Sequence, residues 1–412
     1  MKLFSGIYRP DAKVGRFLAV LILSGISFGL YRGIQDSYLA EIMHISKFER
    51  GIVEFFREIP GLIVVLLLAL MYRLSASRIF KIGSAIMTGG IIGLLFTSTS
   101  PFLHTKIMVV IFTVLFSLGE HIIMPVRTTI LLDYSRREKA GSSLGISTSI
   151  GQLGQILGFI LVTGLFTFLL RKGIERTDIL GFRLVFGASS AFMVTSLLVV
   201  MALKETESKT QMRRFYFAKK FRKFYMLEVF YGARKQIFIT FAPYVLILYY
   251  GADPSIMSLL YAVCAGFGIV CGPFVGKLID KLGYKTVMIA DTLILVLVCL
   301  LYGFSHRVFP MEIAFIVVCV NFVLDSVISI ASMASNVYVQ RIASSQEEIT
   351  ATLSTGISVN HVISILIALL GGWIWEKTGI EVLFLMSAFL GLLNSIYAAT
   401  IKKSEEVITS AS

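Results

Sequence analysis

Charged side chains that could do chemistry lie inside long apolar runs of this chain. Glu120 and Arg127 fall in one run, Arg234 and Lys235 in another, and Asp325 in a third. An ionisable group at membrane depth costs several kcal/mol unless it is paired or hydrated, so such groups are functional candidates. Acids and bases in these positions predict two kinds of chemistry, the binding of a charged solute and the exchange of a proton.

The two acids among them are the candidates for proton exchange. His121 directly follows Glu120, and Arg127 lies two helical turns further along on the same face. Asn321 shares a helical face with Asp325. A carboxylate that alternates between a cation and a proton couples proton movement to transport, because loss of the cation favours the protonated form. We expect Glu120 to come first in this role, because His121 stands beside it, and Asp325 second.

Arg234 and Lys235 are adjacent cations with no acid beside them in the sequence. Burying two cations requires a partner, and the sequence offers Asp325, Glu120 or an anionic solute. The residues predicted to form the pathway for substrate and protons are Arg32, Glu120, His121, Arg127, Arg234, Lys235, Gln236, Asn321 and Asp325.

A second set of charges lies toward the outer ends of the first two predicted helices. Arg32 and Asp36 are four residues apart, so they share a face and can pair. Glu54, Arg57 and Glu58 form another set on one face. We predict that Asp36 and this second set form an outer gate of ion pairs. A permanent structural network fits the same residues equally well.

The composition indicates which elements hold these residues. Of 412 residues, 56% are hydrophobic and 15% are charged, and mean hydropathy is +0.83. A soluble domain has about 25% charged residues, so the composition excludes a soluble globular protein and a nucleic-acid-binding domain. The net charge of +13 fits Lys and Arg gathered at the inner leaflet of a membrane. We expect a multi-pass membrane protein with no cofactor and, because all cysteines lie in apolar runs, no disulfide or metal site.

Twelve apolar stretches are long enough to cross a bilayer core of about 30 Å, which takes roughly 20 helical residues. They lie near residues 16–40, 51–73, 78–99, 105–133, 141–170, 179–203, 225–250, 255–276, 285–305, 310–338, 349–375 and 380–401. The one long connection divides them six and six. We therefore predict an N-terminal bundle over 1–203, a basic linker over 204–224 and a C-terminal bundle over 225–412.

Lys and Arg in the connections predict the orientation of the chain. If the N-terminus is cytoplasmic, the inside connections hold about three times as many basic residues as the outside ones. Both termini are therefore expected in the cytoplasm. Within the linker 204–224, Phe217, Phe221 and Phe224 recur at helical spacing among basic residues. We expect part of it to form an amphipathic helix that lies on the anionic cytoplasmic leaflet.

The connection between the eighth and ninth predicted helices reads Gly276-Lys277-Leu278-Ile279-Asp280-Lys281-Leu282-Gly283-Tyr284-Lys285. It resembles the signature G-x-x-x-D-[RK]-x-G-[RYK]-[RK] of the major facilitator superfamily (MFS), and every key position matches. The resemblance implies an all-α fold of two pseudo-symmetric six-helix bundles, with helices 1, 4, 7 and 10 lining a central cavity. It also implies a cytoplasmic latch, which holds one conformation shut through Gly276, Asp280, Lys281, Gly283 and Lys285. We expect Asp280 to cap a neighbouring helix N-terminus.

The first half departs from family patterns in two places. Residues 69–78, equivalent to the latch, lack both glycines and the aspartate, so we expect the latch to depend on the C-terminal half. The fifth helix keeps three glycines of the drug/proton antiporter pattern, Gly145, Gly154 and Gly158, but has Phe159 in place of its proline. The missing proline argues against a multidrug exporter, and the glycines indicate close helix packing.

These observations predict a secondary active transporter that moves a small solute by alternating access. The cations favour an anionic or zwitterionic organic solute, and the acids favour proton coupling. The alternatives are an exporter of amphipathic, drug-like compounds, a uniporter and a non-transporting membrane sensor. The sequence has no ATP-binding loop and no His-Glu-x-x-His motif, which argues against a pump or an enzyme. We expect a monomer whose partners are the solute, protons and membrane lipids. The lack of an N-x-S/T site favours the inner cell membrane of a bacterium.

Overall fold

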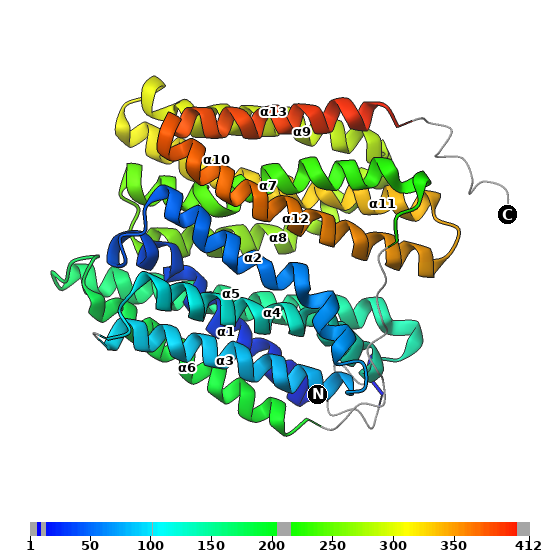
Figure 1. The fold of residues 1–412 in the computed structure, drawn as a ribbon, viewed down its shortest axis with the longest axis horizontal. Coiled ribbons are helices and arrows are strands. Elements are labelled where there is room, and N and C mark those ends of the chain that lie inside the picture. The colour runs from blue at the N-terminus through cyan, green and yellow to red at the C-terminus, as the bar shows by residue number, and fades with distance from the viewer. Residues whose placement is uncertain (1–5, 10–13, 101, 204–215, 402–412) are drawn as a thin grey trace. The chain divides into compact units, whose positions relative to one another are not determined.

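The computed structural model describes residues 6–9, 14–100, 102–203 and 216–401, and all regular elements in these ranges are helices (Figure 1). The one β-type contact in the same ranges is an isolated bridge between Tyr8 and Ser135. Ten helical segments are long and apolar enough to cross a membrane. The all-α membrane fold predicted from hydropathy is confirmed.

The first half of the chain forms six long helices. They are α1 (Val14–Ser37) with its π-helical extension η2 (Tyr38–Ile42), α2 (Lys47–Leu70), α3 (Ala76–Thr99), α4 (Lys106–Tyr134), α5 (Ala140–Arg171), which follows the short η3 (Arg137–Lys139), and α6 (Ile179–Met201). The second half begins with the short η4 (Lys219–Phe221). Its longer helices are α7 (Arg222–Tyr250), α8 (Pro254–Leu282), α9 (Tyr284–Val308), α10 (Met311–Ser329), α11 (Met333–Ile342), α12 (Gln346–Thr378) and α13 (Ile380–Ala399).

The tenth predicted helix is interrupted. A 3-10 turn, η5 (Ile330–Ser332), joins α10 to α11 where a single helix over 310–338 was expected. The three elements together still make one membrane-crossing segment, Met311–Ile342. Counting that segment once, the described residues form twelve long helices, the number that the sequence predicts, and ten of them are apolar enough to cross a membrane. The two long helices outside these ten segments are α2 and α7. They are long enough to cross a membrane, but the charged residues of the ion pairs described below lower their hydropathy.

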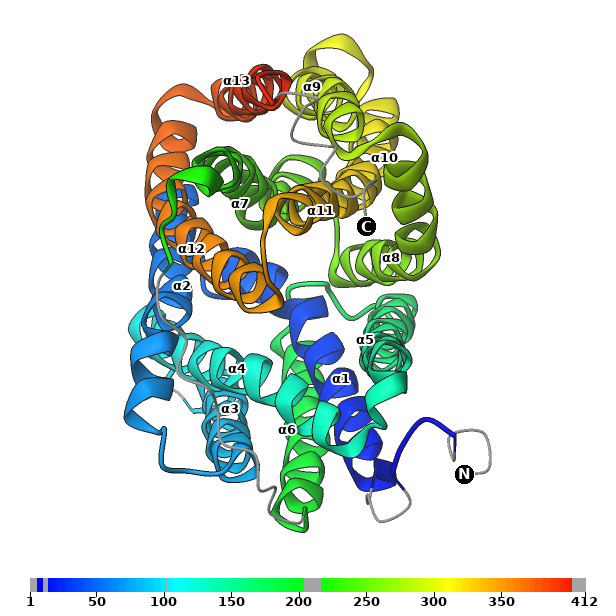
Figure 2. The same cartoon turned by 90° about the vertical axis from the view of Figure 1, so that its right-hand side faces the viewer.

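The chain forms two compact units, each with its own core. Unit 1 contains Met1–Ile45, Phe56–Met212 and Ala252–Ala265, and unit 2 contains Ser46–Phe55, Arg213–Gly251 and Gly266–Ser412. Helix α2 therefore begins in unit 2 and continues in unit 1, whereas α8 begins in unit 1 and ends in unit 2. In the end-on view of Figure 2, α7 lies beside α12 and α13 within unit 2, and these helices contact one another.

Glycines allow α1 and α5 of unit 1 to pack closely. A Cβ atom on Gly154 would lie 2.6 Å from the Ile22 carbonyl oxygen, and one on Gly158 would meet the Ile26 carbonyl. Small residues of this kind let helix backbones approach in membranes. Gly145 differs, because a Cβ there would meet nothing within 4 Å. Two of the three antiporter-type glycines thus serve helix packing.

Basic residues at the start of each unit's first helix bind the last helix of the same unit. In unit 1, Arg16 Nη1 donates to the Ala202 carbonyl oxygen (3.0 Å), at the end of α6. In unit 2, Lys223 Nζ donates to the Thr400 carbonyl oxygen (3.0 Å), at the end of α13. Cations stabilise the carbonyl ends of helices, where the helix dipole is negative. Each contact joins the start of the first long helix to the end of the last helix in its half of the chain, so the two contacts correspond to each other.

The linker differs from the expected amphipathic helix where it is described. Phe221 and Phe224 are fully buried in the core of unit 2 and face no leaflet, whereas Phe217 is 67% exposed. Tyr216 donates a hydrogen bond to Glu348 (2.7 Å) on α12, and this bond raises the pKa of the Tyr216 phenol. The expectation for Phe221 and Phe224 was wrong because α7 begins at Arg222 and turns them toward its own bundle. Residues 204–215 lie outside the described ranges.

Candidate functional site

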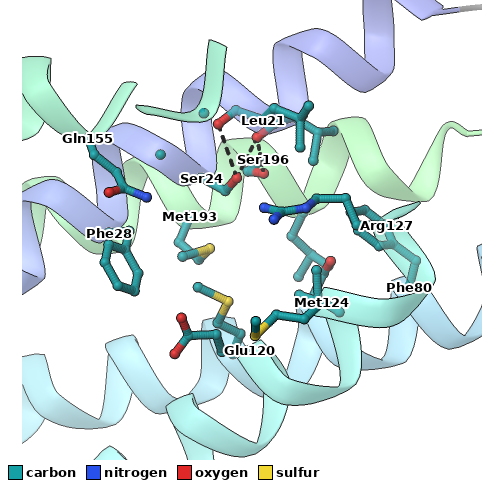
Figure 3. A pocket seen from close by; sticks show the side chains of 17 residues that line it. Leu21, Ser24, Phe28, Phe80, Glu120, Met124, Arg127, Gln155, Met193 and Ser196 are labelled. Atoms are coloured by element: carbon teal, nitrogen blue, oxygen red, sulfur yellow. Dashed lines mark hydrogen bonds between the residues drawn. The ribbon is translucent and has the colours of Figure 1, made fainter. Parts of the chain in front are cut away.

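Helices α1, α3, α4, α5 and α6 of unit 1 surround a cavity of about 180 Å³ (Figure 3). Its polar lining comes from Glu120 and Arg127 on α4, Gln155 on α5, and the hydroxyl groups of Ser24, Ser84 and Ser196. Its apolar lining includes Phe28, Phe80, Met87, Met124 and Met193. The cavity has the size of a small organic solute and offers it both charged and soft apolar contacts.

Glu120 and Arg127 carry opposite charges and lie on separate sides of this cavity (Figure 3). Among the described residues, neither side chain makes a hydrogen bond or an ion pair. The charged groups that act on the Glu120 carboxylate through space are Arg57, Glu58, Arg32 and Arg127. The structure thus places two of the three predicted pathway residues of α4, Glu120 and Arg127, at one cavity.

His121 does not line the cavity. Its Nδ1 atom lies 2.8 Å from the Ser117 carbonyl oxygen and 3.2 Å from Ser117 Oγ, on its own helix. Ser117 Oγ also donates to the Arg57 carbonyl oxygen on α2 (2.6 Å). Consecutive helical residues point about 100° apart, so His121 and Glu120 face different neighbours. The reason for ranking Glu120 above Asp325 in proton exchange is therefore removed.

Arg32 and Asp36 form an ion pair near the end of α1. Arg32 Nη1 lies 3.4 Å from Asp36 Oδ2 and donates a hydrogen bond to Gln35 Oε1 (2.9 Å). Tyr261, on the part of α8 that belongs to unit 1, donates to Asp36 (2.7 Å), and the Arg32 guanidinium lies over its ring. The Tyr261 ring stacks in turn on Phe159. These contacts hold both charged side chains in place. The Asp36 side chain is 3% exposed, and the Arg32 side chain is partly buried.

The structure divides the predicted set on α2. Arg57 and Glu58 pair with each other in unit 1, whereas Glu54 belongs to unit 2. Glu54 accepts hydrogen bonds from Arg50 Nη1 (2.9 Å) and from Gln236 Nε2 (2.9 Å). Its side chain and that of Arg50 are 1% and 0% exposed. Three residues that share one helical face thus have partners in two different units.

The Arg50–Glu54 pair is surrounded by α7. The Arg50 guanidinium lies over the Tyr244 ring, 5.5 Å from its centroid, and Gln236 also donates to Thr240 Oγ1 (2.8 Å). Gln236, a predicted pathway residue, therefore bridges the pair to α7. A buried pair with this many hydrogen bonds holds the first turns of α2 in unit 2.

Arg234 meets Asp325 in unit 2. Arg234 Nη1 lies 3.2 Å from Asp325 Oδ1, and the two side chains are 4% and 14% exposed. Asp291 on α9 also acts on Arg234 through space. Arg234 Nη2 and Asn321 Oδ1 are buried without a hydrogen-bond partner among the described residues. Of the partners that the sequence offered for Arg234, the structure selects Asp325.

Lys235 lies apart from this pair although it is adjacent in sequence. Its Nζ atom lies 5.9 Å from the centroid of the Tyr231 ring and acts through space on Glu228. Glu228 accepts hydrogen bonds from Ser335 (3.1 Å) and Asn360 (3.3 Å). The adjacent cations thus act on different acids: Arg234 pairs with Asp325, whereas Lys235 acts through space on Glu228.

The predicted latch joins α8 to α9. Gly283 adopts φ +81°, which favours glycine, and it allows the sharp turn after α8 ends at Leu282. Lys285 Nζ donates to the carbonyl oxygens of Ala399 and Ile401 (both 2.7 Å), at the end of α13. Asp280 is exposed and caps no helix among the described residues, because Gly283 is the N-cap of α9. The capping role expected for Asp280 was wrong.

A cavity of about 370 Å³ lies at this turn in unit 2. Its charged lining residues are Asp280, Lys281, Lys285 and Arg341. Gly276 lies within α8, two turns before its end. Of the predicted latch residues, Lys285 is the one whose side chain hydrogen-bonds to the end of α13.

The sequence matches the model of the Major Facilitator Superfamily twice, over residues 17–224 and 224–410. The chain belongs to this superfamily. The match over each half agrees with the two six-helix repeats, and it makes the chain a secondary active transporter that works by alternating access. No curated protein matches the sequence.

Solved transporters share this fold. A mutant form of the nucleoside transporter NupG superposes with a TM-score of 0.75 at 15% identity, covering 94% of this chain and 99% of that chain. The D-xylose-proton symporter gives 0.74 at 12% identity, with 94% and 98% covered. A bacterial homolog of the human lysosomal transporter Spinster gives 0.70 at 14% identity, with 96% and 98% covered. At these sequence identities the comparison shows a shared fold and does not identify the solute.

Sequence reasoning missed several residues of these clusters. Arg50 lies one residue before the predicted start of the second helix, so it was counted among the loop charges. Its four-residue spacing from Glu54 was the signal that could have found it. Tyr261, which donates a hydrogen bond to Asp36, gives no such signal. In the sequence, an isolated tyrosine in an apolar run looks like any tyrosine that only packs against its neighbours.

Proposed function

We propose that this transporter couples the movement of an anionic or zwitterionic organic solute to protons. The observation that carries the proposal is the Arg234–Asp325 pair, two charges that are almost fully buried in a membrane-spanning bundle. The Nη2 atom of Arg234, which carries two N–H bonds, has no partner among the described residues and can bind an anionic group of the solute.

The coupling follows from the energy of buried charges. When an anionic group of the solute binds Arg234, it competes with Asp325 for the guanidinium. A carboxylate that loses its cation in a dry interior takes up a proton, since an isolated buried charge costs more than a neutral acid. Two titratable groups besides Arg234 and Asp325 act on this exchange. Asp291 acts through space on Arg234, and the Cys299 thiol acts through space on both members of the pair.

An exporter of amphipathic compounds is the second candidate. The methionine and phenylalanine lining of the unit 1 cavity favours it, because such side chains adapt to apolar surfaces of different shape. Phe159, in place of the antiporter proline, argues against it.

Asp325→Asn should abolish proton coupling. In liposomes with an imposed pH gradient, the wild-type protein should accumulate a solute from a panel of organic anions and zwitterions. The variant should equilibrate the same solute but accumulate it at least about 10-fold less, because Asn cannot carry the proton. The measurements are solute uptake and the internal pH reported by a trapped dye.

The matched control is Asp178→Asn. Asp178 caps α6 by accepting from the Leu180 N–H, and asparagine caps helices equally well, so coupling should be unchanged. Uptake by the wild type that ignores the pH gradient would identify a uniporter and refute the coupling proposal.

We further propose that both termini and the linker lie in the cytoplasm of a bacterial cell. In a background whose four cysteines are replaced by alanine, we would introduce Lys219→Cys and Glu175→Cys, both at exposed positions. An impermeant maleimide should label Glu175→Cys in intact cells and Lys219→Cys only after permeabilisation. The reverse pattern would overturn the proposed orientation.

A further inference from the structure

The cavity of unit 1 holds two opposite charges that do not neutralise each other. Glu120 and Arg127 both line it, and the described residues give neither one a hydrogen bond or an ion pair. Seven residues separate them on α4, which corresponds to roughly 10 Å along the helix axis. An ion pair requires about 4 Å between the charged atoms, so each charge needs another partner.

The neighbouring charges are already engaged. Arg57, which acts on Glu120 through space, pairs with Glu58, and Arg32 pairs with Asp36. A carboxylate and a guanidinium that remain unpaired at membrane depth are expensive unless water or a ligand compensates them. This cavity therefore presents two unsatisfied charges at its two sides.

The space between the charges is mainly apolar. Met87, Met124 and Met193 line it from three different helices, and Phe28 contributes from a fourth. Figure 3 shows the Met124 and Met193 side chains lining the same space as Glu120 and Arg127. Methionine is flexible and polarisable, so this wall suits a hydrocarbon chain without requiring one fixed shape.

We infer that this cavity binds an elongated zwitterion, with its ammonium group at Glu120, its carboxylate at Arg127 and its hydrocarbon body against the methionines. The cavity is a second site for the solute, distinct from Arg234 in unit 2, and the inference rests on the proposed transport of an anionic or zwitterionic solute. Gln155, which also lines the cavity, can accept a further hydrogen bond from the ammonium group. An α-amino acid with an uncharged side chain is excluded, since its two charged groups sit on one carbon and cannot reach both sides.

A series of ω-amino acids tests the predicted charge separation. We would measure Tm of the purified protein in detergent with glycine, 4-aminobutanoic acid, 6-aminohexanoic acid and 8-aminooctanoic acid. Binding to the folded state raises Tm, and we expect a rise of about 2 °C or more with 8-aminooctanoic acid and none with glycine. Equal stabilisation by all chain lengths, or by none, would overturn the inference.

Two neutral variants assign each end of the ligand. Glu120→Gln should weaken 8-aminooctanoic acid binding about 10-fold or more but leave octanoate binding intact, because only the ammonium contact is lost. Arg127→Gln should do the opposite, sparing octylamine. Glu175→Gln, at an exposed position, is the matched control and should change neither affinity. Loss of both affinities in either variant would contradict the assignment.

A charge exchange provides a further check. The double variant Glu120→Arg, Arg127→Glu should still bind 8-aminooctanoic acid, in reverse, while each single reversal should not. Asp325→Asn should bind this zwitterion normally although it loses proton coupling. Failure of the inference therefore appears in the Tm shifts alone, and failure of the proposed function appears in the pH-driven uptake alone.

Discussion

Replacing Arg50 by methionine should destabilise the protein by about 3–5 kcal/mol. The substitution leaves the Glu54 carboxylate, 1% exposed, without the cation that lies 2.9 Å away. Removing one member of a buried ion pair is costly because the remaining charge stays desolvated and uncompensated. The measurement is Tm in detergent, together with the yield of monodisperse protein.

Two further variants separate charge compensation from packing. Arg50→Met combined with Glu54→Gln should recover most of the lost stability, because glutamine is neutral and its Oε1 still accepts from Gln236 Nε2. The matched control is Arg307→Met, which breaks the pair of Glu381 with an arginine that is 66% exposed. Its effect should stay below about 1 kcal/mol, as for exposed pairs generally. An Arg50→Met protein as stable as the wild type would show that the pair contributes little.

Gly158→Leu should separate α1 from α5 and destabilise unit 1 by about 1–3 kcal/mol or more. A Cβ at this position would meet the Ile26 carbonyl oxygen and would lie 2.7 Å from the Leu30 nitrogen. Both are backbone atoms, so no side-chain rotation can relieve the overlap, and the helices must move apart. We expect a lower Tm and weaker binding in the cavity, which α1 and α5 both line.

Gly164→Leu is the control on the same helix. A Cβ at Gly164 meets nothing within 4 Å, and the position is exposed. Leucine favours the helix over glycine by up to about 1 kcal/mol, so this variant should be as stable as the wild type or slightly more stable. Equal destabilisation by both substitutions would point to a general effect of leucine in α5 and against close packing at Gly158.

The helices were predictable to within a few residues, and the errors had consequences. The prediction 285–305 corresponds to α9, Tyr284–Val308, because an apolar run bounded by charges marks a membrane helix clearly. The prediction 51–73 corresponds to α2, Lys47–Leu70, and this shift moved Arg50 from a loop into a buried pair. Charged residues at a helix start lower the local hydropathy, so hydropathy places such boundaries poorly.

Hydropathy and charge along the chain are enough to predict a membrane protein of twelve helices. Each membrane-spanning helix must make its backbone hydrogen bonds within itself and present an apolar surface to the lipid, so its own residues mark it. The latch motif is enough to indicate the superfamily. The partners of the buried charges required the folded structure. Arg234 meets Asp325, 91 residues away, and Gln236 meets Glu54, 182 residues away. Such pairings depend on how helices pack, and helical spacing constrains only neighbours three or four residues apart.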